Sequence, residues 1–509
     1  MREYSRTQNA AINTLTSSIM QIVNVILGFI SRTIFIHLLS SDYLGVNSLY
    51  TNILTVLSFA ELGIGNAIVF SLYKPIANHD KSKIQALMTL YKKAYQLIGG
   101  VIFALGLCVI PFMRYLIKDA PDIKENIILI YILFLLNTSV SYLYSYKKTL
   151  ITANQKDYIV QLYTRAFQLI QIVLQSIFLL LTHEYIIYLI IHIVCTVGQN
   201  IVLSIKADKM YPFIAEKNDN KLSKEETNSI FDNVKALFVY KFGSVILNGT
   251  DNIIISSIIN VATVGIASNY TMLMNNVTNI ISGAINSLTA SVGNLSVKGS
   301  KEQIRSIMHQ LLMICVWLYG FIGICFFVLA NEFVELWIGP KYLLDQSVVF
   351  AILFSIYING VQYAAYTFRT TQGLFIQSRW VPMISAIINI ILSVWWGKTI
   401  GLSGIFIATG ISRLLTTTLV DPWLVYKNNF SKKPFEYYFK YFAESLAVVI
   451  NGLIQYWLIG LVPITGWIGF FVKVIIVSIT ANVVFLIELG WTKDFRNLVN
   501  RVAPSFRKG

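Results

Sequence analysis

Fourteen stretches of this chain are each long and apolar enough to cross a lipid bilayer. A spanning helix needs about 20 mostly apolar residues, because that length matches the hydrocarbon thickness of the membrane. The apolar runs are continuous rather than alternating every second residue, so they predict helices and not a transmembrane β-barrel. The predicted spans are 12–37, 44–73, 90–112, 126–146, 157–181, 185–205, 234–258, 264–296, 306–331, 346–369, 379–397, 402–426, 440–460 and 466–489.

The composition excludes a soluble domain. Hydrophobic residues make up 55% of the 509 residues and charged residues 13%, whereas a soluble protein has roughly a quarter charged. We therefore predict an all-α polytopic membrane protein. The four cysteines lie inside apolar runs and the five histidines are scattered, so we expect neither disulfides nor a metal site. No cofactor is expected.

The net charge of +15 reflects the orientation of the spans rather than a nucleic-acid partner. When both termini are placed on the cytoplasmic side, nearly all loop Lys and Arg fall on that side as well, as the positive-inside rule requires. The cations left in the outer loops are Arg114, Lys118, Lys124, Lys341 and Lys398. All outer loops are short, so no extracytoplasmic domain is expected.

The order of the spans predicts two six-helix lobes. We expect an N-terminal lobe at 1–210, a polar cytoplasmic linker at 211–233 and a C-terminal lobe at 234–430, followed at 431–509 by two more helices and a basic tail. The stretch 31–88 aligns without a gap with 251–308. Its matches include Gly45 with Gly265, Ser48 with Ser268, Tyr50 with Tyr270, Thr51 with Thr271 and Lys81 with Lys301. Two parallel pseudo-symmetric lobes with a substrate path between them are typical of transporters.

Ionisable residues inside the spans are the candidates for function, because a charge in the bilayer is expensive. Cations outnumber carboxylates, and a water-filled cavity with surplus cations suits an anionic substrate such as a phosphate. We predict that Arg32, Arg165, Lys241 and Arg413 bind substrate, with Asn248 and Asn252 as polar lining, and that Glu61 and Asp251 serve gating or ion coupling.

A structural interpretation stays open for the same residues. Glu61 with Arg32, or Asp251 with Lys241 or Arg413, would form ion pairs that lock helices together. The asparagines would then serve as hydrogen bonds between helices. Arg369 lies close to the end of a span, and we expect its long side chain to reach the headgroups.

Two stretches resemble the Wzx-type polysaccharide flippases of the multidrug/oligosaccharidyl-lipid/polysaccharide exporter superfamily. The first is SRTIFIHLLSSDYLGVNSLYTNILTVLSFAELGIGNAIVFSLYKPIA at 31–77, and the second is GTDNIIIS with the residues that follow, at 249–297. The resemblance covers the chain as twelve core helices in two lobes, with two more here. It anchors Arg32 in SRT, Glu61 in ELG and Asp251 in GTDN.

The resemblance implies a flippase that moves an undecaprenyl-pyrophosphate-linked oligosaccharide from the inner to the outer leaflet, by alternating access around a cationic central cavity. It further implies a bacterial cytoplasmic membrane protein with cytoplasmic termini, Na⁺ or proton coupling, and contacts with membrane lipid and other polysaccharide-assembly proteins.

Two other readings compete with the flippase. An ion-coupled multidrug or small-molecule antiporter of the same superfamily would prefer an acidic cavity, whereas the surplus here is basic. A polyprenyl-linked glycosyltransferase or polymerase would need a large outer loop with acidic residues, and the sequence offers none. The chain also has no GxxxxGK[ST] motif for a nucleotide triphosphate. We therefore expect no enzyme activity.

Overall fold

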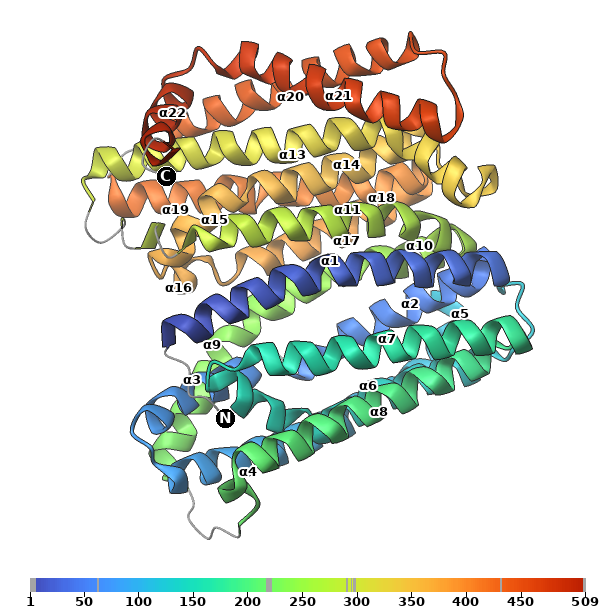
Figure 1. Ribbon diagram of the computed structural model, residues 1–509, viewed down its shortest axis with the longest axis vertical. Helices are drawn as coiled ribbons and strands as arrows, with labels where there is room; N and C mark the ends of the chain where they lie inside the picture. Colours follow the sequence, from blue (N-terminus) through green and yellow to red (C-terminus); the bar gives the residue numbers. More distant parts are fainter. Residues whose placement is uncertain are drawn as a thin grey trace. The chain divides into compact units, whose positions relative to one another are not determined.

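The computed structural model describes residues 6–61, 64–216, 222–289, 292–293, 295, 299–430 and 433–506, and these residues form helices joined by short turns (Figure 1). Eleven helices or helix pairs in this part of the chain are long and apolar enough to cross a membrane. Each coincides with one of the fourteen predicted spans. The predicted fold class, an all-α polytopic membrane protein, is thus confirmed.

The three other predicted spans are interrupted or more polar. The span at 44–73 is divided into α2 (Ser41–Leu57) and α3 (Ile64–Ala77), with a 3₁₀ turn at Ser58–Glu61. The span at 234–258 is divided at Thr250 into α9 (Lys224–Gly249) and α10 (Asp251–Ile258). The third corresponds to the asparagine-rich α11 (Val261–Ser287). These three spans also carry most of the polar residues singled out above.

The helices form two compact units, Met1–Gly265 and Ile266–Gly509. In the first unit α4 packs on α6, α6 on α8 and α7 on α8, while α1 lies against α7. The bounds of these helices are α1 Arg6–Leu38, α4 Lys81–Val109, α6 Ile127–Ala153, α7 Asp157–Thr182 and α8 Tyr185–Met210; the short α5 is Met113–Leu116.

The second unit repeats this order of packing. Its α13 packs on α14, α14 on α18 and α17 on α18. The bounds are α13 Lys301–Ile338, α14 Gln346–Val361, α15 Tyr363–Thr371, α16 Phe375–Ser378, α17 Val381–Thr399, α18 Leu402–Leu415 and α19 Thr417–Asn429. The repetition of three successive helix pairs supports the internal repeat inferred from the sequence.

Three helices follow the second repeat. Both α20 (Phe435–Gly460) and α21 (Gly466–Leu489) run alongside α13, and α22 (Lys493–Phe506) lies at the end of the bundle where α13 begins (Figure 1). Lys473 Nζ on α21 donates to both carboxylate oxygens of Glu332 on α13, at 2.9 and 3.0 Å. This ion pair connects α21 to α13.

The packing units do not begin where the predicted lobes do. Helices α9 and α10, which the sequence assigns to the C-terminal lobe, pack in the first unit against α2 and α3. A repeat boundary describes how the chain is duplicated, and a compact unit describes which helices contact each other. The predicted lobes at 1–210 and 234–430 therefore stay a prediction.

Two tyrosines matched by the sequence repeat have equivalent roles. The Tyr50 hydroxyl donates to the carbonyl oxygen of Ile127 at 2.9 Å, at the start of α6. The Tyr270 hydroxyl donates to Asn331 at 2.6 Å and accepts from the backbone of Leu344 at 3.1 Å, just before α14. Both rings are fully buried. Each tyrosine thus ties the second helix of its repeat to the beginning of the fourth.

Replacing Tyr270 by Phe is expected to lower the free energy of unfolding by about 1–2 kcal/mol, because the half-buried Asn331 side chain and Leu344 backbone amide lose a partner. Reversible unfolding in mixed detergent micelles measures the change. Tyr456→Phe is the control, because that ring is 54% exposed. Equal stability of Tyr270→Phe and the control would contradict the proposed role.

The matched glycines Gly45 and Gly265 allow α2 and α11 to approach closely. A Cβ atom on Gly45 would lie 1.9 Å from the carbonyl oxygen of Val261, and one on Gly265 would lie 2.2 Å from the carbonyl oxygen of Ser41. Real Cβ atoms do not come so close to another heavy atom. Both positions therefore require glycine, and small residues at helix crossings are typical of membrane proteins.

Candidate functional site

Glu61 occupies the interruption between α2 and α3. It is the last residue of the 3₁₀ turn Ser58–Glu61, and its side chain is half-buried. Short 3₁₀ stretches between helices often mark functional hinges. Gly65, on the first turn of α3, lies beside it: a Cβ there would be 3.0 Å from the Tyr95 hydroxyl and 3.8 Å from Glu61 Oε1.

Two tyrosine hydroxyls donate to the Glu61 carboxylate. Tyr95 on α4 donates to Oε1 at 2.5 Å, and Tyr142 on α6 donates to Oε2 at 2.9 Å. Behind them the Tyr91 hydroxyl donates to that of Tyr95 at 3.0 Å and accepts from Thr149 at 3.2 Å. We call Glu61, Tyr91, Tyr95 and Tyr142 the tyrosine cage.

The cage holds a carboxylate within the membrane-spanning part of the first unit. Hydrogen bonds to an ionised acceptor are short and about twice as strong as neutral ones, and they offset part of the cost of removing the charge from water. Lys148, six residues beyond Tyr142, interacts electrostatically with Glu61. A cation or proton that binds Glu61 would compete with the tyrosine hydroxyls and alter the packing of three helices at a helix break.

The repeat does not duplicate the cage. The position equivalent to Glu61 is Ile281, which is buried in the core of the second unit. Leu311 and Cys315 take the positions of Tyr91 and Tyr95, and both are buried there as well. The two repeats share a scaffold, but a polar site in one is replaced by apolar packing in the other.

Lys241 lies at the same level of the first unit as Glu61. Its neighbour Phe242 packs edge-to-face on Phe59, with ring centroids 5.5 Å apart, and Phe59 is two residues from Glu61. The Lys241 side chain is half-buried on α9. The structure therefore brings a predicted substrate-binding cation and the predicted coupling carboxylate to one depth on adjacent helices.

Asp251 begins α10 directly after the interruption at Thr250. A carboxylate in the first turn of a helix is favourable because it faces the positive end of the helix dipole. Before the break, Asn248 is exposed and its amide donates to the Ser244 carbonyl at 2.6 Å. Asn252, on the other side of the break, is half-buried. The three side chains thus flank the second helix interruption of the first unit.

Arg32 and Arg165 are not brought together. Arg32 lies six residues from the end of α1, next to Tyr188, whose hydroxyl bonds to Ser31. Arg165 lies 17 residues from the corresponding end of α7 and donates to Gln168 at 2.6 Å. At a rise of 1.5 Å per residue, the two differ in depth by roughly 16 Å along their helices. One phosphate group cannot contact both in this conformation.

Arg413 is enclosed within the second unit. Its side chain is 7% exposed, and its guanidinium donates to Asn359 of α14 at 2.6 Å. The four cations predicted to bind substrate therefore occupy different environments: Arg32, Arg165 and Lys241 are half-buried on three different helices of the first unit, and Arg413 is buried in the second. Their roles stay predictions.

The prediction that the Arg369 side chain reaches the headgroups is wrong. The guanidinium does not reach the headgroups, because the residue is 2% exposed and its Nε lies 3.2 Å from Asp421 Oδ1 on α19. It also donates to Ser378 of α16. Asp421 was not singled out, although an acid next to a proline in an apolar run is a visible signal.

The tyrosines around Glu61 were missed as well. Tyr91 and Tyr95 stand four residues apart, as do Tyr142 and Tyr146. This spacing places each pair on one face of a helix. Two such pairs in consecutive spans indicate that tyrosine hydroxyls lie between these two helices. A carboxylate in the preceding span is then a candidate to accept their hydrogen bonds.

Comparison with solved structures relates this fold to membrane transporters. The lipid II flippase MurJ, in an inward-closed conformation, matches with a TM-score of 0.67 and 15% sequence identity, over 95% of this chain and 99% of that one. An inward-facing MATE family multidrug resistance transporter of the MOP superfamily matches with a TM-score of 0.64 and 12% identity, over 80% of this chain and 95% of that one. The fold of this chain is therefore similar to the folds of these two transporters.

A third match belongs to the same superfamily. A MOP transporter from Pyrococcus furiosus, described as having a binding pocket of reversed polarity, matches with a TM-score of 0.55 and 13% identity, over 82% of this chain and 95% of that one. No family model and no curated protein matches the sequence. With its eleven candidate spans among the described residues, the chain is a multi-pass membrane protein whose fold is similar to those of these transporters.

Proposed function

We propose that this protein is a flippase that moves an undecaprenyl-pyrophosphate-linked oligosaccharide from the inner to the outer leaflet of the bacterial cytoplasmic membrane. The movement supplies surface polysaccharide assembly and proceeds by alternating access around a cationic central cavity. The substrate's sugars would meet polar side chains such as Asn248 and Asn252, and its lipid would remain in the bilayer.

The extent of the MurJ match carries the proposal. That match includes nearly the whole of both chains, whereas the MATE transporters extend over 80 to 83% of this chain and 94 to 98% of their own. The MATE transporters thus leave 17 to 20% of this chain without a counterpart. A lipid flippase of the same length as this chain favours a lipid-linked substrate.

The sign of the charges supports an anionic substrate. Lys241, Arg32 and Arg165 stand in the first unit with carboxylates at Glu61 and Asp251, and the Glu61 charge is already held by tyrosines. Arginine and lysine are the side chains that bind phosphate groups. The cationic side chains of the first unit are thus of the type that would meet a pyrophosphate.

Ion coupling belongs to the same proposal. We assign Na⁺ or proton binding to Glu61 and Asp251, because each stands at a helix interruption in the first unit. Both termini would lie in the cytoplasm, and other polysaccharide-assembly proteins would take over the translocated product.

The deciding experiment locates the lipid-linked saccharide in a depletion strain. A membrane-impermeant reagent that modifies sugars is applied to intact cells and to inverted vesicles. We expect the saccharide to accumulate on the cytoplasmic face, with loss of surface polysaccharide. An unchanged distribution between the leaflets would overturn the flippase.

An ion-coupled multidrug or small-molecule antiporter is the second candidate. The tyrosine cage favours this candidate, because a cation can replace the tyrosine hydroxyls as the partner of the Glu61 carboxylate. Such replacement would suit a protein that exchanges cations across the membrane. In the same depletion strain an antiporter would leave lipid-linked saccharide unchanged and increase sensitivity to cationic drugs. The two outcomes separate the candidates in one strain.

A further inference from the structure

The last helix of the described chain, α22, is amphipathic. Its charged residues are Lys493, Asp494, Arg496 and Arg501, and its apolar side includes Phe495 and Leu498. It follows α21 directly and lies at the end of the bundle where α13 begins (Figure 1). A helix with one basic and one apolar face at the end of a membrane bundle is suited to the membrane interface.

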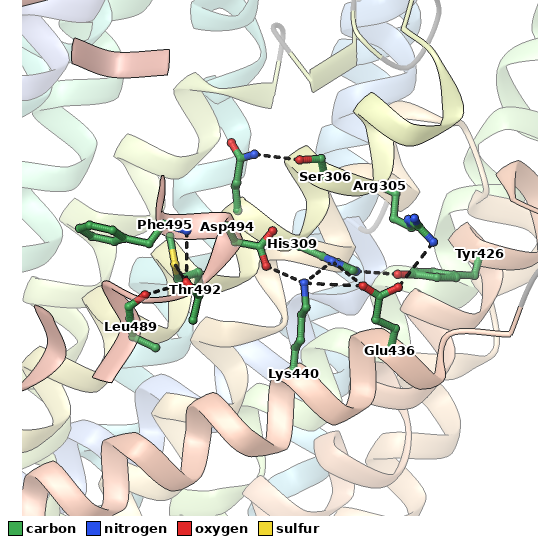
Figure 2. Close-up of polar contacts among 12 residues, drawn as sticks. Arg305, Ser306, His309, Tyr426, Glu436, Lys440, Leu489, Thr492, Asp494 and Phe495 are labelled. Carbon is green, nitrogen blue, oxygen red and sulfur yellow. Dashed lines mark hydrogen bonds and ion pairs between the residues drawn. The ribbon is translucent and has the colours of Figure 1, made fainter. Parts of the chain in front are cut away.

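Asp494 attaches α22 to the bundle. Its carboxylate accepts from Lys440 of α20 at 2.6 Å and is 7% exposed (Figure 2). Phe495 stacks on Trp317 of α13, with ring centroids 5.9 Å apart. The position of α22 is thus set by an ion pair and by a ring contact on two different helices.

Lys440 belongs to a larger polar cluster at this end of the bundle. It also donates to Nδ1 of His309 at 2.9 Å and lies 3.7 Å from Glu436, which in turn lies 3.5 Å from Arg305 (Figure 2). The acid of α22 is therefore neutralised inside the protein. Lys493, Arg496 and Arg501 are exposed, so the charged side chains that α22 exposes within its described part are all basic.

A cavity of about 360 Å³ lies beneath α22. One wall is a stripe on α13 formed by Ile307, Gln310, Leu311 and Ile314, whose spacing places them on one helix face. The stripe lies between two and four turns from the start of α13, which is roughly 9 to 20 Å into the bundle.

The other walls are mostly aliphatic too. Leu288, Val292 and Leu295 come from the chain after α11, and Leu498 comes from α22. The polar lining consists of Gln310, which is 3% exposed and donates to Ser306 at 3.0 Å, and of Arg501. The cavity is thus lined mainly by aliphatic side chains, and the Arg501 guanidinium of α22 is part of its wall.

We propose that this cavity binds an acyl chain of an anionic glycerophospholipid, whose headgroup phosphate is held by Arg501. Charge complementarity selects this occupant. The lining excludes a polar oligosaccharide, the volume suits one chain rather than a folded peptide, and the exposed basic residues of α22 attract anionic headgroups. The site is independent of what the transporter carries.

A photoreactive lipid tests the site directly. The full-length protein is placed in nanodiscs with phosphatidylglycerol that carries a diazirine in one acyl chain, and labelled peptides are mapped by mass spectrometry. We expect label on 307–314 and 498–501 to exceed by several-fold the label from phosphatidylcholine with identical chains. Equal labelling by the two lipids, or label confined to other segments, would overturn the proposal.

Two arginines on the same helix provide a matched pair. Arg501→Gln is expected to reduce the preference for phosphatidylglycerol about tenfold in native mass spectrometry, because the phosphate loses its guanidinium. Arg496→Gln removes an equal charge from α22 but does not line the cavity, and we expect less than a twofold change. Equal losses in both variants would indicate attraction by the helix as a whole and overturn the cavity site.

Ile314→Trp tests the cavity separately from the charge, because an indole would occupy the space of the acyl chain. Loss of the acyl-chain label with retained binding of lipid at the surface of α22 is expected. Retention of the label would contradict the site. If a polyprenyl pyrophosphate displaced the label at concentrations where phosphatidylglycerol did not, the cavity would belong to the transported substrate, and the proposal would be wrong.

Discussion

Glu61→Gln is expected to lower transport at least tenfold and to remove its dependence on Na⁺ or protons, while the protein still inserts. Glutamine has nearly the same shape but no charge, and its amide nitrogen cannot accept a bond from a tyrosine hydroxyl. One of the hydroxyls of Tyr95 and Tyr142 would then face another donor. The cost of one unsatisfied group, about 1–3 kcal/mol, is small enough for the fold to survive.

The measurement uses proteoliposomes in which the imposed Na⁺ or proton gradient is varied. Tyr142→Phe is the matched control: it removes one donor to the carboxylate but retains the charge. We expect it to keep the ion dependence and to shift the ion concentration for half-maximal transport several-fold. If the Glu61→Gln variant kept the ion dependence of the unmodified protein, the tyrosine cage would have only a structural role.

Gly45→Ala is expected to destabilise the protein by about 3 kcal/mol or more, or to prevent its accumulation. The new methyl group would lie 1.9 Å from the Val261 oxygen and 2.7 Å from its carbonyl carbon. Backbone atoms cannot turn away as a flexible side chain does, so the two helices must separate. Overpacking of buried sites usually costs about 1–3 kcal/mol and sometimes more, and a clash with backbone belongs at the upper end.

Gly100→Ala is the control for this substitution. Gly100 is exposed on α4 and has nothing within 4 Å of its Cβ position, so alanine should stabilise the helix by up to about 1 kcal/mol. Thermal unfolding of the two purified variants in the same detergent compares them. A Gly45→Ala variant as stable as Gly100→Ala would show that the crossing of α2 and α11 is not tight in the protein.

The membrane-spanning helices were predictable because hydropathy is a local property. Every helix that meets the length and apolarity of a span coincides with a predicted one. The interruptions at Glu61 and Thr250 were harder to see, since each lies in a run whose average is apolar. Glu61 and Asp251 each stand at such a break, whereas Arg32 and Arg165 lie within unbroken helices, so a charged residue in an apolar run does not by itself predict an interruption.

The repeat was predictable for a different reason. Gly45 and Gly265 match in sequence because both lie at a helix crossing where a side chain does not fit. Tyr50 and Tyr270 match because each ends in a hydrogen bond to another helix. Identities at residues that serve a geometric need carry more information than identities among interchangeable aliphatic side chains.

The partners of the charged residues could not be predicted. Tyr95 and Tyr142 lie 34 and 81 residues from Glu61, and Asp421 lies on a different helix from Arg369. Which faces of two spans meet depends on packing and on the rotation of each helix, and hydropathy does not record either. The structural pairing predicted for Glu61 was an ion pair with Arg32, and the tyrosine cage was not foreseen.

The restriction of the cage to one repeat limits the energy that it can deliver. In the proposed coupling the Glu61 carboxylate would take up one elementary charge in each transport cycle, and the position equivalent to it in the second repeat, Ile281, would add none. One charge that crosses a potential of 100 mV releases about 2.3 kcal/mol. Since about 1.4 kcal/mol corresponds to a factor of ten, this electrical work alone would sustain a substrate ratio of roughly fifty between the two leaflets.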